Sequence, residues 1–290
     1  MSHTIHKPVL LEAVLTYLAP KQGESYLDLT AGYGGHAAAV RERTKNVQHM
    51  TLVDRDQTAI AALQPFAEAG ADVIHASFEE ASTNLLRQGA SFSMILADLG
   101  VSSLHLDTSS RGFSFARSGP LDMRMDQTSE LTAETIVNEY SEGQLEDILR
   151  HYGEEPRAKA VAGAIVRGRP YASTSQLAAA IASALPRGGR HHPATKSFQA
   201  IRIAVNDELG QLERSMPQWL RLLKPGGRLA VITFHSLEDR LVKQAFAEVA
   251  GNGYDAEFTN LTKHPVVADE TELATNPRAR SAKLRVLQRK

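Results

Sequence analysis

A glycine-rich turn preceded by an acid is the first feature of the sequence that could do chemistry. The turn reads Asp28-Leu-Thr-Ala-Gly-Tyr-Gly-Gly-His36 and follows a short apolar run, residues 25–29. Glycines at a strand-to-helix turn let the backbone approach a ligand closely, and the helix N-terminus favours negative charge. The spacing departs from the dinucleotide fingerprint G-x-G-x-x-G, because position 37 is Ala. The turn predicts a cofactor site without selecting the cofactor.

A second acid narrows the choice of cofactor. Asp54 closes the next apolar run, residues 47–53, and lies twenty residues past Gly34. A carboxylate at this place can accept hydrogen bonds from both hydroxyls of a ribose. The pair fits either a nicotinamide dinucleotide or S-adenosylmethionine. Asp28 favours S-adenosylmethionine, because a carboxylate can hold the ammonium of its methionine moiety but would repel a pyrophosphate.

Two later apolar runs end in residues that fit the same site. Residues 71–75 lead to Phe78, and residues 92–96 lead to Asp98. The runs alternate with helical patterns, which predicts βαβ units and a parallel sheet. Ligands of open α/β sheets bind at the carboxyl ends of the strands, so we expect these residues to surround an adenosine. The alternative is a packed α/β domain whose turn glycines are incidental.

The alternation stops after about residue 106. Residues 107–125 are rich in Gly, Ser, Pro and Arg, and four helical patterns without strands follow, at residues 132–140, 144–151, 156–166 and 174–185. The sequence therefore predicts an α/β domain in two parts, residues 1–106 and 201–290, with a helical domain inserted at 107–200.

The second part of the α/β domain begins with a long amphipathic pattern, residues 194–223. We expect this helix to break or kink at Pro217, because proline lacks an N–H. A buried strand at 228–234, a helix at 235–248 and an edge strand at 283–288 follow.

Charge is segregated along the chain although the formal net charge is only −1. Residues 150–203 hold nine basic and two acidic residues, a balance of +7, and residues 276–290 hold six basic residues and no acid. Such segments suit a phosphate backbone, because each neutralised phosphate releases counterions. The alternative is a solvated basic face.

The overall composition is that of a globular protein, with 42% hydrophobic and 22% charged residues. The absence of cysteine excludes disulfides, zinc–thiolate sites and cysteine nucleophiles. Neither a signal peptide nor a membrane span is visible, so we expect a soluble, cytoplasmic protein.

Longer motifs along the chain are more specific than the turn and the strand ends. Through these motifs the sequence resembles the bacterial ribosomal RNA small subunit methyltransferase H family. They run in order from residue 6 to residue 281, nearly the whole chain. The resembling stretches are His6-Lys-Pro-Val-Leu-Leu-Glu-Ala-Val14, Gly32-Tyr-Gly-Gly-His36, Asp54-Arg-Asp56, Asp98-Leu-Gly-Val-Ser-Ser103, Arg111-Gly-Phe-Ser-Phe115, Gly119-Pro-Leu-Asp-Met-Arg-Met125, His192-Pro-Ala-Thr-Lys-Ser-Phe-Gln-Ala-Ile-Arg202, Phe234-His-Ser-Leu-Glu-Asp-Arg240 and Asn276-Pro-Arg-Ala-Arg-Ser281.

The resemblance implies a Rossmann-like S-adenosylmethionine-dependent methyltransferase fold with an inserted all-helical domain. It implies methylation of the N4 amino group of a cytidine in 16S rRNA, in the decoding region and within the assembled small subunit. It places the cofactor contacts on Gly34, Gly35, His36, Asp54, Phe78 and Asp98, and a further contact on His105, where the family usually has Gln. The region after Gly251 is short for the family.

The chemistry expected of such a site is demanding, because the N4 lone pair of cytosine is delocalised into the ring. The amine must be held against the sulfonium methyl and an acceptor must draw its N–H bonds out of conjugation. Asp98 or a nearby backbone carbonyl is a candidate acceptor, but we assign no catalytic residue. Tyr33, Phe113 and Phe115 could stack on a base taken from its stack, or pack in the core or loops.

Other polar residues have two readings. Arg111, Arg124, Lys196 and Arg202 could contact RNA phosphates or form surface salt bridges, and His235 could orient substrate or bond a local backbone group. His191 and His192 lack carboxylates at ligand spacing, so contact with phosphate or solvent is favoured and no metal is predicted.

Two other functions compete with methyl transfer to RNA. A nicotinamide-dependent oxidoreductase is disfavoured by Asp28 and by the missing third glycine. A non-catalytic ribosome-assembly factor is disfavoured by the intact Gly34-Gly35-His36 turn together with Asp54. The oligomeric state is left open.

Overall fold

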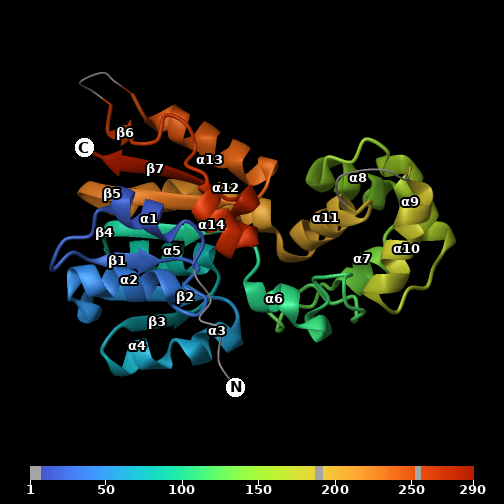
Figure 1. The fold of residues 1–290 in the computed structure, drawn as a ribbon, viewed down its shortest axis with the longest axis horizontal. Helices are drawn as coiled ribbons and strands as arrows, with labels where there is room; N and C mark the ends of the chain where they lie inside the picture. Colours follow the sequence, from blue (N-terminus) through green and yellow to red (C-terminus); the bar gives the residue numbers. More distant parts are fainter. Residues whose placement is uncertain (1–7, 187–191, 252–255) are drawn as a thin grey trace. The chain divides into compact units, whose positions relative to one another are not determined.

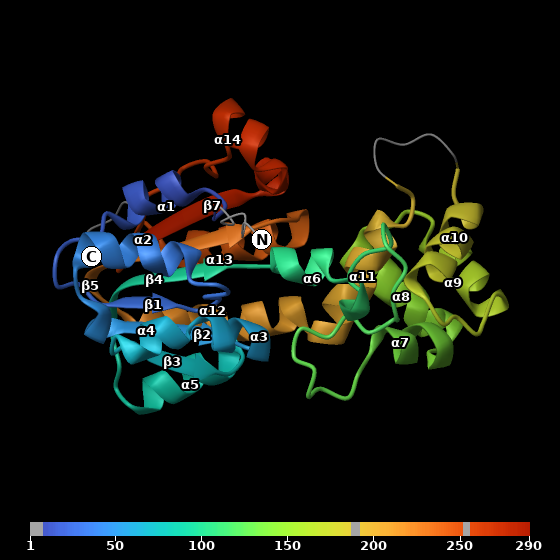
Figure 2. The ribbon, with the colours of Figure 1, turned by 60° about the horizontal axis from the view of Figure 1, so that its bottom comes forward.

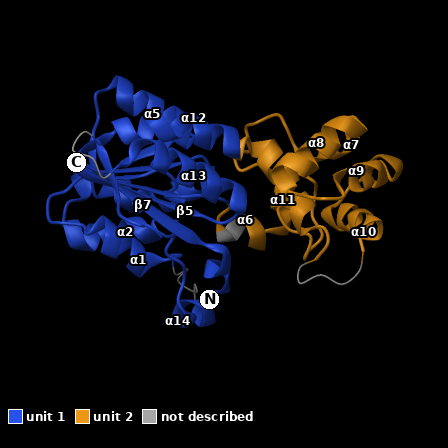
Figure 3. Cartoon of the chain, turned by 90° about the horizontal axis from the view of Figure 1, so that it is seen from above, with its two compact units in different colours: residues 1–100, 209–290 blue, residues 101–208 orange. Residues whose placement is uncertain are grey.

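The computed structural model describes residues 8–186, 192–251 and 256–290. Of the residues named above, His6, Lys7 and His191 lie outside these ranges, as do Arg187 and Arg190 of the basic segment 150–203. The chain folds as two compact units, unit 1 with residues 1–100 and 209–290 and unit 2 with residues 101–208 (Figure 3). The structural units divide at 100/101 and 208/209. The domain boundaries predicted from the sequence, 106/107 and 200/201, remain predictions.

Unit 1 is built on a seven-stranded sheet with the order β3-β2-β1-β4-β5-β7-β6 (Figure 1). The strands are β1 Tyr26–Asp28, β2 Met50–Asp54, β3 Asp72–His75, β4 Phe92–Asp98, β5 Leu223–Thr233, β6 Phe258–Asn260 and β7 Lys283–Arg289. The first five strands pair in parallel, as the alternation predicted, and β7 runs antiparallel to β5 and β6. β7 was expected at the edge, but the short β6 covers its outer side.

Helices cover both faces of the sheet, because each strand alternates its side chains between two separate cores. Helices α1, α2 and α4 pack on one face, and α5, α12 and α13 on the other; Figure 2 shows α1 and α5 on opposite sides. The helices assigned here are α1 Leu11–Leu18, α2 Gly35–Thr44, α3 Gln57–Ala62, α4 Gln64–Glu68, α5 Phe78–Arg87, α12 Glu208–Arg221, α13 Ser236–Val249 and α14 Glu270–Thr275.

Three expected elements differ in the structure. The helical pattern between the apolar runs 47–53 and 71–75, residues 57–69, forms two short helices, because Pro65 cannot donate the backbone bond that would continue α3. The predicted strand 47–53 opens with the 3-10 turn η1 Val47–His49. The amphipathic pattern 194–223 breaks at Asp207, which is left-handed at φ 47°, and not at Pro217, which stays inside α12.

Unit 2 is helical, with no strand among its described residues. Its elements are α6 Ser103–Asp107, the 3-10 turn η2 Ser109–Arg111, α7 Ala133–Glu139, α8 Glu142–Gly153, α9 Ala158–Arg167, α10 Thr174–Ala184 and α11 Thr195–Asn206. Apolar side chains from α7 to α11 form one core, with Leu149, Val161 and Ile201 fully buried. Ser141 begins α8 with a capping box, and Ser173 caps α10 by accepting from the Gln176 N–H.

A helix that spans a bilayer needs about 20 predominantly apolar residues. Within the described ranges, none has the length and apolar character needed to span a membrane.

Candidate functional site

Three carboxylates gather at the carboxyl edge of the sheet in unit 1. Asp28 ends β1, Asp54 ends β2 and Asp98 ends β4, and these strands are neighbours in the sheet. The parallel register pairs Asp28 with Leu52 on one side and Leu96 on the other, so the following residues rise at the same edge. The structure thus brings together the acids that the sequence placed at separate strand ends.

Asp28 is a buried carboxylate held in a fixed orientation. It is 1% exposed, and its Oδ2 accepts from the Tyr26 hydroxyl at 2.8 Å while its Oδ1 accepts from the Thr30 N–H at 3.2 Å. Burial raises the pKa of Asp28 to about 6, although nearby His36 and the two hydrogen bonds act in the opposite direction. No Lys or Arg of the described chain pairs with it, so a ligand cation would find an oriented counter-charge.

Beside Asp28 lie His36 and Asp98. The His36 side chain is 7% exposed, and its Nε2 lies 3.7 Å from Oδ2 of Asp98. Neither ring nitrogen of His36 nor Oδ1 of Asp98 has a hydrogen-bond partner within the described chain, although all three atoms are buried. Buried polar atoms without partners are costly, so they mark a place that a polar ligand completes.

Asp54 shapes the glycine turn. Its Oδ2 accepts from the Gly32 N–H and its Oδ1 from the Asp56 N–H, each at 2.8 Å. Burial raises the pKa of Asp54, and the two backbone bonds lower it in part. Each carboxylate oxygen has a further lone pair, so Asp54 can hold the turn and still accept from a ligand.

The glycines of this turn are required by packing as well as by conformation. Gly32 and Gly34 are left-handed, at φ 51° and 75°. A Cβ on Gly34 would lie 2.6 Å from the Phe66 ring, and one on Gly35 would lie 2.6 Å from Cγ of Pro8. Gly34 and Gly35 are therefore needed for contacts within the protein, whatever they do for a ligand.

The two remaining predicted cofactor residues lie in different surroundings. The ring of Phe78 is part of the core, 8% exposed, and meets Trp219 edge-on at 5.5 Å. His105 belongs to unit 2, where it is buried, stacks on Phe113 at 4.8 Å and accepts from the Ser102 N–H through Nδ1. Each of these two side chains thus makes contacts with residues of its own unit.

The three candidate stacking rings separate by exposure. Phe113 is buried, and Phe115 packs on His192 and Phe198. Tyr33, in the glycine turn, is 42% exposed. Of the three residues, Tyr33 alone is exposed, and it belongs to the glycine turn of unit 1.

The four cations chosen as RNA contacts are engaged inside unit 2. Arg111 donates to the carbonyls of Arg124 and Met125, and Arg124 forms a bidentate pair with Asp122. Their side chains therefore stabilise the loop that precedes α7.

The other two cations are held in the same unit. The Lys196 ammonium donates to the Glu154 carbonyl, and Arg202 forms a bidentate pair with Glu208. The salt-bridge alternative thus fits Arg124 and Arg202.

Other cations of the basic segment remain on the surface. Arg157, Lys159 and Arg167 lie at or in α9 and are exposed, and no ion pair of the described chain involves them. The sequence predicted a helix here. It could not show that other cations, Arg111 and Lys196, would donate to backbone carbonyls within the protein.

His235 satisfies its local backbone. It caps α13, because its Nδ1 accepts from the Glu238 N–H, while its Nε2 lies 3.2 Å from the Glu238 carboxylate. Of the two readings of this residue, the structure supports the bond to a local backbone group.

Comparison with known proteins agrees with the motifs. The chain is 46% identical over 291 residues to a ribosomal RNA small subunit methyltransferase H from Trichormus variabilis, which covers 98% of this chain and 92% of the relative. It is 44% identical over 307 residues to the protein of the same name from Heliobacterium mobile, with 98% of both chains covered. Among solved structures, it is similar to a putative methyltransferase from Streptococcus mutans, with TM-score 0.45 and 11% identity over 99% of this chain and 100% of that chain. A structural likeness of that size adds nothing to the assignment.

A family model supplies the remaining comparison. The model described as the MraW methylase family matches residues 3–290. This match and the relatives confirm the predicted resemblance, the Rossmann-like methyltransferase fold with its helical insertion, and S-adenosyl-L-methionine as cofactor. The chain belongs to the MraW methylase family.

Proposed function

We propose that this protein transfers a methyl group from S-adenosyl-L-methionine to the N4 amino group of a cytidine in 16S rRNA. The observation that carries the proposal is the carboxyl edge of unit 1, where Asp28, Asp54 and Asp98 end neighbouring strands and where the buried nitrogens of His36, beside Asp98, have no hydrogen-bond partner in the described chain. The relatives' names support ribosomal RNA of the small subunit as the substrate. We expect the reaction to take place in the cytoplasm on the assembled small subunit.

The charges of this edge fit S-adenosyl-L-methionine. The cofactor carries an ammonium and a sulfonium, and it supplies the methyl group when bound. Asp28 would hold the ammonium, Asp54 would accept from the ribose hydroxyls, and His36 and Asp98 would meet polar atoms between them. A nicotinamide dinucleotide would bring two phosphate charges toward the same carboxylates, so the edge disfavours the oxidoreductase alternative.

The remaining cofactor contacts would come from the backbone and from outside this edge. Gly34 and Gly35 would bring the turn close to the cofactor, and His36 follows them directly. Because the Phe78 ring is in the core, we place its contact on the backbone at the start of α5. His105 stays a proposed contact from unit 2.

The target amine must be positioned and polarised. Asp98 Oδ1 has no partner within the described residues, so it can accept an N–H of the cytosine amine and favour a lone pair directed at the methyl group. Tyr33 offers an exposed ring on which a base that has left its stack can lie. These two residues receive proposed positioning roles; no general base is assigned.

Mass spectrometry of 16S rRNA fragments tests the proposal. We expect N4-methylcytidine to be absent from cells that lack the gene and to return when the chain is supplied. Asp54→Ala should fail to restore it, whereas Asp72→Ala, which removes an exposed acid at the far end of β3, should restore it fully. A strain whose 16S rRNA is unchanged by loss of the gene would contradict the proposal, as would methylation at an atom other than N4.

A further inference from the structure

A polar pocket lies in unit 1, away from the carboxylates. It has a volume of about 330 Å³, at the lower end of the range of roughly 300–1,000 Å³ that is usual for small-molecule sites. Its donors are Lys21, Lys224, Arg228 and Gln288, and its single acid is Glu24. The turn Lys224-Pro-Gly-Gly227 forms one wall.

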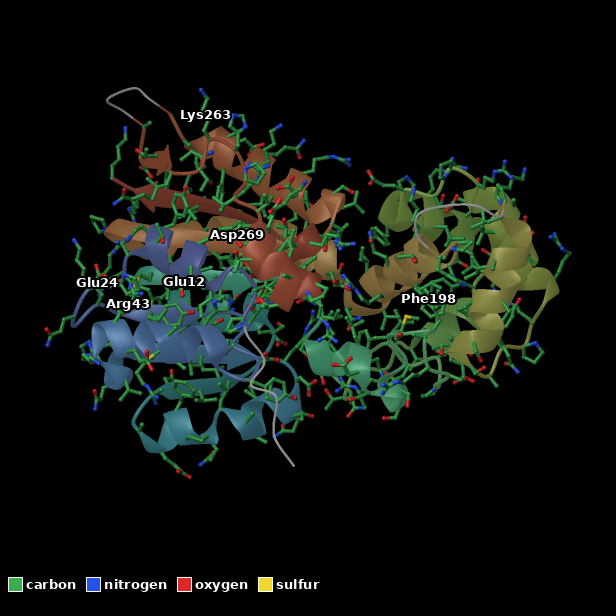
Figure 4. All side chains as sticks on the ribbon, viewed as in Figure 1. Glu12, Glu24, Arg43, Phe198, Lys263 and Asp269 are labelled. Carbon is green, nitrogen blue, oxygen red and sulfur yellow. The ribbon has the colours of Figure 1, made fainter. Side chains whose placement is uncertain are left out.

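The pocket is at the amino edge of the sheet. Residues just before β1 line it, together with the opening part of β5 and the end of the antiparallel β7. Register confirms the placement, since Phe92 pairs with Leu223 and Arg228 pairs with Gln288. In Figure 4 the labelled Glu24 lies at the end of the sheet where β7 finishes. Asp28, Asp54 and Asp98 lie at the opposite edge.

Arg228 is the buried donor of this pocket. It is 8% exposed; one terminal nitrogen donates to Glu24 at 2.8 Å and the other to the Ala19 carbonyl at 3.2 Å. Its Nε is buried and has no hydrogen-bond partner in the described ranges. Leaving the buried Nε–H of Arg228 without an acceptor costs free energy, so a ligand that supplies an acceptor would be favoured here.

Two lysines leave the pocket with an excess of positive charge. Glu24 is matched by Arg228, and it also accepts from the Lys21 N–H at 2.9 Å. The Lys224 ammonium donates to the Ser25 hydroxyl at 3.1 Å, and the exposed Lys21 ammonium forms no ion pair within the described chain. Neither lysine charge is balanced by an acid, so the pocket attracts an anion.

Two glycines, Gly226 and Gly227, form part of the wall. A Cβ on Gly227 would lie 2.8 Å from the Lys224 carbonyl oxygen and 3.0 Å from that of Phe92. Gly226 is left-handed at φ 77°, with nothing within 4 Å of its missing Cβ. Gly227 is thus fixed by packing, and Gly226 lets the chain turn with its backbone at the surface.

We propose that this pocket binds a phosphate group. Phosphate offers acceptors on every side, which suits the two ammonium groups and the guanidinium, and the volume leaves room for what the phosphate is attached to. The phosphate has two sources of the same chemistry, the backbone of the RNA substrate or a free anion such as pyrophosphate. Binding of an RNA backbone phosphate rests on the proposed function. In that case the RNA substrate would contact the protein at this pocket, away from the base that is methylated.

Two double variants of the full chain test the pocket. Lys21→Gln with Lys224→Gln removes its unbalanced charges, whereas Lys243→Gln with Lys263→Gln removes two exposed charges of the same unit that do not line it. Pyrophosphate binding is measured by calorimetry. Binding to small ribosomal subunits from a strain lacking the gene is measured by filter retention. S-adenosylhomocysteine affinity is the check on folding and should change less than about twofold in both variants.

The outcomes separate the sources. We expect the pocket variant to lose pyrophosphate binding and to bind subunits about tenfold more weakly, as the loss of one charge-assisted contact predicts, while the control variant matches wild type. Loss of pyrophosphate binding with unchanged subunit affinity would assign the pocket to a free anion. If wild type binds no pyrophosphate and the two variants bind subunits equally, the phosphate site is refuted. If the pocket variant loses pyrophosphate binding as expected but wild type does not methylate small subunits, the proposed function fails and the phosphate site is retained.

Discussion

The two edges of the sheet in unit 1 carry opposite charge. The carboxyl edge holds Asp28, Asp54 and Asp98, whereas the amino edge holds Lys21, Lys224 and Arg228. This difference underlies the two proposed sites, one for a cationic cofactor at the acidic edge and one for an anion at the basic edge. The formal net charge of −1 hides this division, because it adds charges that act on different ligands.

The acidic edge is tested most strongly by Asp54→Ala. The substitution removes both acceptors for the ribose hydroxyls, and two charge-assisted bonds of about 1.5–3 kcal/mol each imply roughly a 1,000-fold loss of S-adenosylhomocysteine affinity. Calorimetry measures the loss, and the charge-matched control Asp72→Ala should bind like wild type.

Binding of the Asp54→Ala variant to small ribosomal subunits shows whether the acidic and the basic edge serve different ligands. If the edges serve different ligands, Asp54→Ala should keep its affinity for small subunits within about twofold while its circular dichroism stays native. Near-normal binding of S-adenosylhomocysteine by Asp54→Ala would break the assignment of the acidic edge.

The buried Asp28 carboxylate should make the free energy of unfolding depend on pH. The pKa of Asp28 is about 6 in the folded protein, above the ordinary value of 3.8, so the folded state holds this proton more tightly. Folding is therefore penalised as pH rises through this window, and wild type should lose stability relative to Asp28→Asn. The full difference is on the order of 3 kcal/mol, at 1.36 kcal/mol per unit of pKa.

Urea denaturation at pH 4 and at pH 8 measures this effect. We expect the free energy of unfolding of Asp28→Asn, relative to wild type, to be higher at pH 8 than at pH 4. A difference between the two proteins that does not change with pH would mean that the Asp28 carboxyl is not perturbed by burial.

A smaller effect is expected from the surface of unit 2. Lys159→Gln with Arg167→Gln removes two exposed cations of α9. If α9 faces RNA phosphates, subunit affinity should fall about threefold to tenfold and the affinity for S-adenosylhomocysteine should not change. Filter retention measures the fall, with Lys243→Gln and Lys263→Gln as the matched pair. Equal affinities of the two double variants would remove α9 from the RNA-binding surface.

The acidic edge was largely predictable from the sequence, and the basic edge was not. Each acid follows its own apolar run, and the closing residues of neighbouring parallel strands must meet, so local patterns suffice for Asp28, Asp54 and Asp98. The basic pocket joins Lys21 with Lys224, which are far apart in the chain and belong to no motif.

The sequence also could not show which cations are already satisfied. Arg202 pairs with Glu208 across the left-handed Asp207, where α11 ends, whereas the sequence had predicted the break at Pro217. Likewise Gly34 looks like a ligand-facing glycine, but its Cβ is excluded by Phe66, which comes from another helix. Such outcomes depend on tertiary packing, which local pattern does not contain.

The salt dependence of two ligands on one protein tests the division of charge most directly. Affinities for S-adenosylhomocysteine and for small ribosomal subunits are measured from 0.05 to 0.3 M salt, roughly the range over which phosphate contacts are screened. We predict that subunit affinity falls steeply, by a slope of about −0.7 to −0.9 for each phosphate contacted, while cofactor affinity changes less than about twofold. Equal slopes for the two ligands would contradict the separation of an acidic cofactor site from basic RNA-binding surfaces.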